Sequence, residues 1–272
     1  LKGRWNNAEL VEQLCFFHKE KRIDIQIALH QWNGEHDKEF RLVFPLSWKE
    51  KRISYEVPFG ETELGKEEMN RIPGERYIQN PAEIAYREVL DYITVNHKNH
   101  NLLIQTSVPV IDFSGDWIGK NQVISPVLMA PRKSCHWEGN WYAREGSHFF
   151  DFSIFSGQED MSSLREKCKE KITPCFLIPG EITISEPFFQ LTGNGIVLST
   201  VKRSNDKKGI IVRLYENLGK TSKGNLKLNF PFESVMETDM IERGIDEIQT
   251  HGNELELNLS PYEIKTFYVK QK

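Results

Sequence analysis

The sequence predicts an all-β fold of two successive β-sandwich domains, and three observations support this prediction. Apolar and polar residues alternate over residues 22–29 and 255–259, which is the period of a strand with one buried face. Short strand-like runs separated by turn residues recur to the end of the chain. Only residues 161–171 form a strong helix candidate.

Length and composition limit the possible partners. At 272 residues the chain can bury a substantial core without disulfides or metals. It carries 35 Lys and Arg residues and 39 Asp and Glu residues. The sequence contains no run of basic residues interleaved with aromatic residues, which is the pattern typical of nucleic-acid binding. No apolar run approaches the roughly 18 residues that a membrane-spanning helix needs. We therefore expect neither a nucleic-acid nor a membrane partner.

The start of the chain and its cysteines suggest two further expectations. The sequence opens at Leu1 without an initiator Met or a signal-peptide pattern, so we interpret it as a fragment of a longer protein. Four cysteines form no C-x-x-C pair, which favours reduced thiols over a disulfide framework or a zinc site. They are Cys15, Cys135, Cys168 and Cys175.

The first part of the chain predicts three strands and a loop. In residues 22–29, alternate isoleucines share one face. A polar connection at 31–38 leads to a second strand at 39–44, and we expect the two strands to form a hairpin-like pair. A third strand covers 52–59, and the charged, Pro-punctuated residues 61–81 predict a long surface loop.

The middle of the chain contains one ambiguous segment. Residues 82–95 combine a helix-favouring first half with a strand-favouring second half. We expect the second half to pair with 102–107 through a turn at 97–101. Strands follow at 123–129 and 147–155, and the latter is apolar on both faces, as expected inside a sandwich. Asp160 then caps an exposed helix at 161–171.

Prolines and Gly180 between residues 173 and 189 predict a crossover between domains. We therefore divide the chain into domains at 1–186 and 187–272. The spacing of the later strands is typical of a small immunoglobulin-like sandwich without the usual cysteine pair. These strands are expected at 196–202, 209–216, 225–230, 254–259 and 263–269.

Several motifs follow one another along the chain in one order. The passage from Phe44-Pro45 to Tyr55-Glu56-Val57-Pro58-Phe59-Gly60 resembles "FP … YE(I/V)xFG" in the C-terminal half of the glycoside hydrolase family 38 α-mannosidases. Leu128-Met129-Ala130-Pro131 stands where the family has "LRSP", and Gly146-Ser147-His148 resembles part of "DxGxHxFxY". Val201-Lys202-Arg203, residues 211–216, Met240-Ile241-Glu242-Arg243 and residues 263–266 resemble the family's closing strands. Two positions depart from the pattern: Met129 replaces the usual Arg, and Arg144 replaces the usual Asp.

The resemblance implies a galactose-mutarotase-like β-sandwich followed by a small β domain. It also implies that the zinc ligands and nucleophilic Asp of the parent enzyme lie in a catalytic domain before Leu1. We therefore expect no cofactor in this fragment, although zinc or another divalent metal is implied for the parent. The two departures imply a rebuilt polar network around Met129 and Arg144.

Candidate catalytic and metal residues are weak. Asp112 and Asp116 flank the turn Ser114-Gly115, where Asp is favoured for backbone hydrogen bonding alone. His97 and His100 lie on an expected hairpin tip with no carboxylate beside them, so we predict no metal there. No catalytic residue is assigned to this fragment.

The richest cluster lies at residues 135–144. Aromatic side chains, including Tyr142, could stack on a pyranose ring while neighbouring polar groups bind its hydroxyls. The alternative is a loop whose aromatics cap the sandwich core. His148 has the same two interpretations, as a core histidine or a ligand contact. The candidate substrate-binding residues are Trp137, Trp141, Arg144 and His148.

These observations predict the C-terminal portion of an α-mannosidase-like glycoside hydrolase. The fragment, inactive alone, would support the catalytic domain of the same chain and wall its site for mannose-containing carbohydrate. Two alternatives stay open: a free-standing carbohydrate-binding module, and a purely structural interaction domain.

Overall fold

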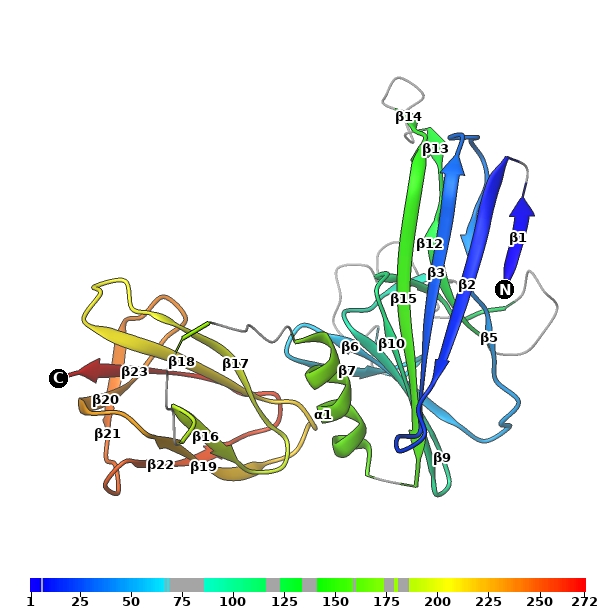
Figure 1. The fold of residues 1–272 in the computed structure, drawn as a ribbon. Coiled ribbons are helices and arrows are strands. Elements are labelled where there is room, and N and C mark those ends of the chain that lie inside the picture. Colours follow the sequence, from blue (N-terminus) through cyan, green and yellow to red (C-terminus); the bar gives the residue numbers. More distant parts are fainter. Residues whose placement is uncertain are drawn as a thin grey trace, which may run out of the picture. The chain divides into compact units, whose positions relative to one another are not determined.

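A computed structural model describes the chain except for residues 6, 67, 69–85, 116–122, 134–140, 159, 174–178 and 181–185. The fold divides into two compact units (Figure 1). The first contains residues Leu1–Val57 and Thr62–Thr173, and the second contains Pro58–Glu61 and Pro174–Lys272. The boundary expected near Glu186 stays a prediction.

The first unit is built on an eight-stranded sheet, of whose last strand only Thr62 and Glu63 belong to this unit. Its strand order is β1 (Lys2–Trp5), β2 (Ala8–Phe16), β3 (Arg22–Trp32), β15 (Gly146–Gly157), β10 (His100–Thr106), β9 (Tyr92–His97), β6 (Arg52–Val57) and β7 (Gly60–Glu63). The long strand β15 runs through the middle of this sheet (Figure 1). Strands far apart in sequence are therefore neighbours, because β3 pairs with β15 along nine residue pairs.

A second, shorter sheet faces the first. Its strands are β4 (Phe40–Arg41), β12 (Val123–Met129), β11 (Val110–Asp112) and β8 (Tyr86–Glu88), and β5 (Phe44–Pro45) also pairs with β12. A two-stranded ribbon, β13 (Arg132–Lys133) and β14 (Trp141–Tyr142), extends beyond it. Buried Ile27, Ile93, Ile111, Ile124 and Phe152 from the two sheets form one apolar core. The prediction of antiparallel sandwich packing is confirmed for this unit.

Helix α1 (Met161–Ile172) begins after Asp160, as predicted, but the expectation of an exposed helix is wrong. Met161, Leu164 and Cys168 are buried against the outer face of the large sheet. Their spacing of three and four residues gives the helix an apolar stripe that its many charged residues conceal in the sequence. Lys169 also anchors the helix, since its Nζ lies 2.7 Å from Glu56 Oε1.

The same helix explains why β15 is apolar on both faces. At the end of the strand, Phe152 is buried between the two sheets and Phe155 is buried beneath α1. Nearer its start, Phe149 is exposed on the outer face, which no helix covers there. The prediction that the whole strand lies inside a sandwich is therefore correct only for its second half.

Most predicted strands are present, but one predicted pairing is wrong. Strands at 22–29, 52–59, 123–129 and 147–155 are confirmed, as is the hairpin of β9 and β10. Residues 39–44 do not form a hairpin with β3, because β4 and β5 pair with β12 in the other sheet. Residues 31–38, whose composition is typical of turns, instead connect a strand of one sheet to a strand of the other. The region 69–85, including most of the predicted loop, lies outside the described residues.

The second unit is also a pair of antiparallel sheets. One has the order β16 (Phe189–Thr192), β19 (Ser222–Leu228) and β22 (Glu254–Leu259). The other has the order β17 (Ile196–Arg203), β18 (Gly209–Glu216), β23 (Ile264–Gln271), β20 (Phe232–Thr238) and β21 (Gly244–Ile248). Leu255, Leu257 and Leu259 are buried in the core between them, which confirms the alternation predicted for β22.

A buried carboxylate organises one end of the second unit. Glu216 is fully buried at the end of β18, and its side chain accepts hydrogen bonds from the backbone N–H groups of Leu218 (2.9 Å), Gly219 (2.8 Å) and Tyr262 (3.1 Å). The Ser222 hydroxyl donates a further bond at 3.1 Å. Two connecting loops are thus held by one side chain, because their amide donors converge on it.

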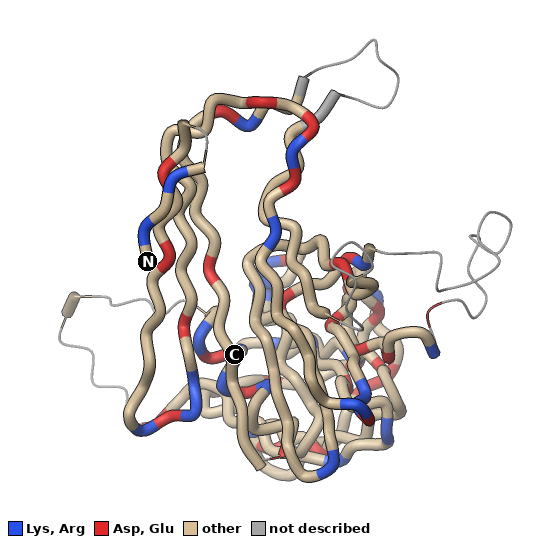
Figure 2. Tube along the Cα trace, turned by 90° about the vertical axis from the view of Figure 1, so that its right-hand side faces the viewer, with Lys and Arg blue, Asp and Glu red and all other residues tan. Residues whose placement is uncertain are grey.

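Charged residues of both signs are distributed along the described chain. Lys and Arg positions are interspersed with Asp and Glu positions on the backbone trace (Figure 2). No described helix is long and apolar enough to cross a membrane. The mixture agrees with the composition, which contains no basic block of the kind that follows a phosphate backbone.

Candidate functional site: a pocket beside the ribbon of the first unit

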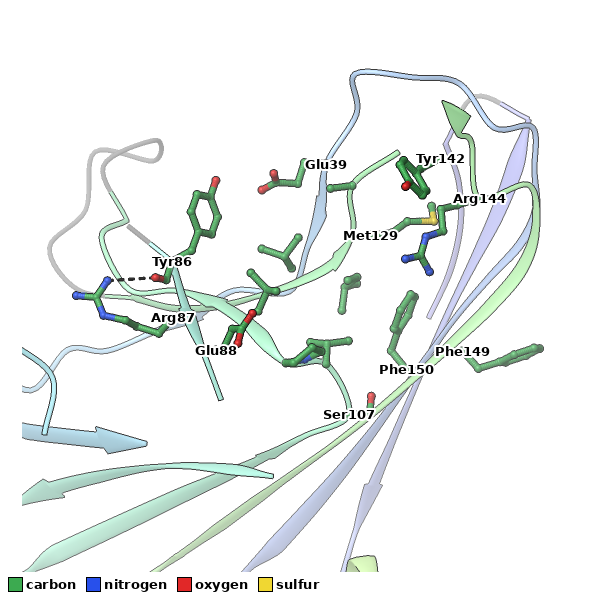
Figure 3. A pocket seen from close by; sticks show the side chains of 16 residues that line it. Glu39, Tyr86, Arg87, Glu88, Ser107, Met129, Tyr142, Arg144, Phe149 and Phe150 are labelled. Carbon is green, nitrogen blue, oxygen red and sulfur yellow. Dashed lines mark hydrogen bonds between the residues drawn. The ribbon is translucent and has the colours of Figure 1, made fainter. Parts of the chain in front are cut away.

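A pocket of about 910 Å³ opens between the two sheets of the first unit (Figure 3). The short sheet contributes Tyr86, Glu88 and Met129 to its wall, and Glu39 precedes β4 at the same wall. Tyr142, Arg144 and Phe150 line it from the ribbon and from β15. The volume lies near the top of the range of about 300–1,000 Å³ that is usual for small-molecule sites.

Arg144 is held at this pocket by an uncommon backbone conformation. Its φ of 54° lies in the left-handed region, which non-glycine residues seldom adopt. His148 Nε2 donates a hydrogen bond to the Arg144 carbonyl oxygen at 2.6 Å, since only the N–H tautomer can bond to a carbonyl. Directly after this turn, the pairing of β15 with β3 shifts register between Gly146 and His148.

The side chain of Arg144 lies toward the pocket, beside Met129 and above Phe150 (Figure 3). Within the described part of the chain, its guanidinium has no hydrogen-bond or ion-pair partner. Phe149, the residue before Phe150 on β15, also lines the pocket, although its ring points to the other side of the strand (Figure 3). The alternation of β15 thus points only the Phe150 ring of this pair toward the pocket.

The opposite wall is fixed by Arg41. Its guanidinium pairs with the carboxylates of Glu39 and Asp112, and its Nη2 donates to the Tyr86 hydroxyl at 2.7 Å. Asp112 is buried, and burial alone would raise its pKa. The Ser114 N–H and hydroxyl donors, each at 2.8 Å, and Arg41 outweigh that effect and hold the pKa below its usual range.

The structure brings together some of the predicted site residues. Arg144 lines the pocket, whereas His148 contacts the Arg144 backbone and does not itself line it. Trp141 lies in β14, where its backbone pairs with Lys133. Trp137 lies outside the described residues. The substrate-binding role of these four residues stays a prediction.

Other pocket residues escaped the sequence analysis. Tyr86, Glu88 and Glu39 come from segments that carry no motif, and they reach the pocket only through sheet pairing. One signal was present: Met129 and Arg144, the two departures from the family pattern, both line this one pocket. The two positions therefore belong to the same local environment.

The weak catalytic and metal candidates show structural roles where they are described. Asp112 bonds to Ser114 and Arg41, which is the turn role considered in the sequence, and Asp116 lies outside the described residues. His97 stacks on Trp48 with ring centroids 5.1 Å apart. Among the described residues, no group of three or more His, Cys, Asp or Glu side chains could hold a metal ion.

Among the described residues, the pocket combines aromatic faces, two carboxylates and the side chain of Arg144, for which no hydrogen-bond or ion-pair partner is present. Tyr86 and Tyr142 are both partly exposed, so their rings and hydroxyl groups are accessible. Such a wall suits a polar ring compound, because aromatic faces pack on C–H groups while charged side chains bind hydroxyls. A retaining glycosidase needs two carboxyls about 5–5.5 Å apart as acid and nucleophile, and Glu39 of this pocket is engaged by Arg41.

Comparison with known proteins connects this fold to carbohydrate chemistry. Residues 195–267 match the family described as the glycosyl hydrolases family 38 C-terminal beta sandwich domain. The chain is 22% identical over 280 residues to "Alpha-mannosidase G" of Dictyostelium discoideum and 21% identical over 275 residues to "Alpha-mannosidase" of Saccharomyces cerevisiae. These alignments cover 96% and 92% of this chain but only 23% and 24% of the two relatives.

Two solved structures share the fold. An α-mannosidase from Enterococcus faecalis V583 matches 96% of this chain with a TM-score of 0.71 at 12% identity. A glycosyl hydrolase family 38 protein from Enterococcus faecalis matches 96% with a TM-score of 0.70 at 13% identity. The chain covers 29% and 30% of these larger proteins. The resemblance seen in the sequence motifs is confirmed: the chain corresponds to the C-terminal β-sandwich region of glycosyl hydrolase family 38 α-mannosidases.

Proposed function

We propose that this chain is the non-catalytic C-terminal portion of an α-mannosidase-like glycoside hydrolase. The intact protein would hydrolyse α-mannosidic bonds, and this portion would support its catalytic domain. The names of the relatives support this proposal, as does the small share of their length that the chain spans. Zinc or another divalent metal would then belong to the catalytic domain.

We also propose specific fold types for the two domains. Residues 1–186 would form a galactose-mutarotase-like sandwich, because a large twisted sheet faces a smaller one in the first unit. Residues 187–272 would form an immunoglobulin-like sandwich, because three-stranded and five-stranded antiparallel sheets enclose one core. Both names rest on architecture and on the family resemblance.

The pocket of the first unit would form one wall of the sugar site. The observation that carries this proposal is the Arg144 guanidinium, which has no partner among the described residues and which a left-handed backbone and the His148 bond hold at a pocket rich in aromatic residues. Backbone strain of this kind costs about 1–3 kcal/mol and often accompanies a functional site. A sugar hydroxyl would give the guanidinium an acceptor.

Kinetics of the intact polypeptide test this proposal. Arg144→Ala should raise KM or lower kcat for an α-mannoside, because it removes a donor from the sugar wall. The matched control is Leu90→Ala, which changes an exposed residue outside the pocket. Unchanged kinetics for Arg144→Ala would remove this pocket from the sugar site.

A free-standing carbohydrate-binding module is the second candidate. It is favoured by the fact that all the described residues that line the pocket belong to the first unit. Calorimetric titration of methyl α-mannoside into the 272-residue chain separates the two candidates. Saturable binding of methyl α-mannoside to the 272-residue chain, lost in Arg144→Ala, supports a free-standing carbohydrate-binding module. Binding that occurs only in the intact polypeptide supports a wall of the sugar site.

A further inference from the structure

Three charged side chains join helix α1 to the large sheet. Lys169, in the last turn of α1, places its Nζ 2.7 Å from Glu56 Oε1 of β6 and 2.6 Å from Asp91 Oδ2. The backbone N–H of Asp91 also donates to Glu56 Oε2 at 3.1 Å. Two carboxylates therefore share one ammonium group. We name Glu56, Asp91 and Lys169 the helix anchor.

The two carboxylates of the helix anchor differ in their access to water. The side chain of Asp91 is 43% exposed, whereas that of Glu56 is 5% exposed. Burial raises the pKa of Glu56 above its usual range, because it disfavours the charged form. The charge of Asp91 adds to this effect, and Lys169 offsets it only in part. Glu56 is therefore the carboxyl group of the anchor that takes up a proton first.

The elements around Glu56 supply no second cation to the anchor within the described chain. Lys169 is the one cation there that pairs with either carboxylate. Lys171, also on α1, donates instead to Gln105 Oε1 of β10 at 3.2 Å. The Tyr92 ring of β9 lies 5.5 Å from the Lys169 Nζ. The remaining ionisable groups on these elements are Cys168 on α1 and Glu61 and Glu63 on β7.

One bound proton would balance the charges of the helix anchor. With both carboxylates ionised, the anchor carries one negative charge in excess at the contact between helix and sheet. A protonated Glu56 removes this excess. Its Oε2 can still accept the Asp91 N–H, and Lys169 can stay paired with Asp91. The neutral form of Glu56 is thus compatible with the observed contacts and avoids a buried charge.

We propose that the helix anchor is a proton-binding latch that holds α1 on the sheet more tightly in mildly acidic than in neutral solution. This inference does not depend on the proposed function. Helix α1 ends at Ile172, and the second unit resumes at Pro174. The latch therefore acts at the point where the chain leaves the first unit.

The direction of the effect follows from proton linkage. In an undocked helix, Glu56 would lie in water with an ordinary pKa of about 4.3. The docked state has the higher pKa, so it binds the proton more tightly and gains stability as pH falls. This gain is complete below the ordinary pKa and is lost as pH rises through the docked one. Asp112 acts in the opposite direction, but only near and below pH 4, because its pKa is lowered.

Hydrogen exchange of the α1 amides, measured by mass spectrometry from about pH 8 to about pH 5, tests the proposal. After correction for the intrinsic pH dependence of exchange, the opening equilibrium constant of α1 should fall at least about threefold toward pH 5. A fully linked proton would change it about tenfold per pH unit. Glu56→Gln, which is neutral throughout, should remove this dependence. Glu166→Gln changes an exposed carboxylate of the same helix and should behave like wild type.

Two results of this measurement would overturn the latch. One is an opening constant of wild-type α1 that stays level or rises toward pH 5. The other is a pH dependence that persists in Glu56→Gln, since Glu56 would then not be the group that binds the proton.

Cys168 gives a second measurement that needs no substitution at Glu56. It is buried under α1, and burial raises the pKa of its thiol to about 12, so a thiol reagent should reach it only when the helix opens. Labelling by a pyridyl disulfide should slow relative to the exposed Cys15 as pH falls from about 8 to about 5. Peptide mapping separates the two sites. A labelling ratio that stays constant or rises toward pH 5 contradicts the latch.

Discussion

His148 Nε2 lies 2.6 Å from the carbonyl oxygen of Arg144, and this bond closes the turn that enters β15. The bond uses the backbone of Arg144 and leaves its guanidinium available to the pocket. Two of the four residues predicted to bind substrate therefore lie differently in this structure. His148 positions the turn, while Arg144 presents the charge.

Substitutions at Arg144 can separate the effect of its backbone conformation from the effect of its charged side chain. Arg144→Gly should leave the free energy of unfolding within about 1 kcal/mol of wild type, because glycine adopts a φ of 54° without strain. Arg144→Val should destabilise by about 1–3 kcal/mol, because a β-branched residue tolerates that conformation poorly. Chemical denaturation measures both values. Equal destabilisation by Gly and Val would show that the backbone conformation does not matter.

Leu257→Asp should destabilise the second unit strongly. Leu257 is buried on β22 between Leu255 and Leu259, and a charge there costs roughly several kcal/mol unless it is paired. Thermal melting should show the loss, and Glu256→Asp on the exposed face of the same strand should melt like wild type. A normal melting curve for Leu257→Asp would contradict the assignment of the buried face.

Glu216→Gln should also weaken the second unit. The carboxylate accepts four hydrogen bonds of 2.8–3.1 Å from Leu218, Gly219, Ser222 and Tyr262. An amide nitrogen cannot accept the bonds made by the oxygen it replaces, so about 1–3 kcal/mol of stability should be lost. Denaturant unfolding measures this, with the exposed Glu254→Gln as control. A loss of stability no larger than that of the control would mean that the hydrogen bonds to Glu216 do not stabilise the two loops.

Acid should destabilise the first unit through Asp112. Its folded pKa is lowered, so the ionised carboxylate stabilises the fold above the unfolded value of about 3.9. That stability is lost as pH falls below this value and through the folded pKa. Melting temperatures between neutral pH and pH 3 should decline less for Asp112→Asn than for wild type, from a lower starting point. Parallel pH profiles would exclude Asp112 as the source.

Local pattern predicted much of the fold. The alternation in β3 and β22 identified their buried faces correctly, because that period depends only on neighbouring residues. Pairing was harder to predict. The partners of β3 are β2 and β15, and β15 is more than a hundred residues away in sequence, whereas the hairpin expected with 39–44 is absent. Strand β2 was missed because apolar residues occur at both odd and even positions of residues 8–16, so the alternation is not regular.

The pocket was only partly predictable for the same reason. Arg144 belongs to a cluster that composition alone makes conspicuous, but its positive φ has no sequence signal, since glycine or asparagine is the usual residue there. Tyr86 and Glu88 reach the pocket through the pairing of β8 with β11, which no motif in either segment indicates. Long-range strand pairing thus determines which side chains meet.

Hydrolysis of an aryl α-mannoside tests the central claim most directly. The assay compares the 272-residue chain with the longer polypeptide that contains it, each supplied with a divalent metal. The account predicts turnover by the longer polypeptide and none above a no-protein control by the 272-residue chain, because under the proposed function the catalytic and metal-binding residues belong to another domain of the longer polypeptide. Turnover by the 272-residue chain, or its absence from the longer polypeptide, would contradict the account.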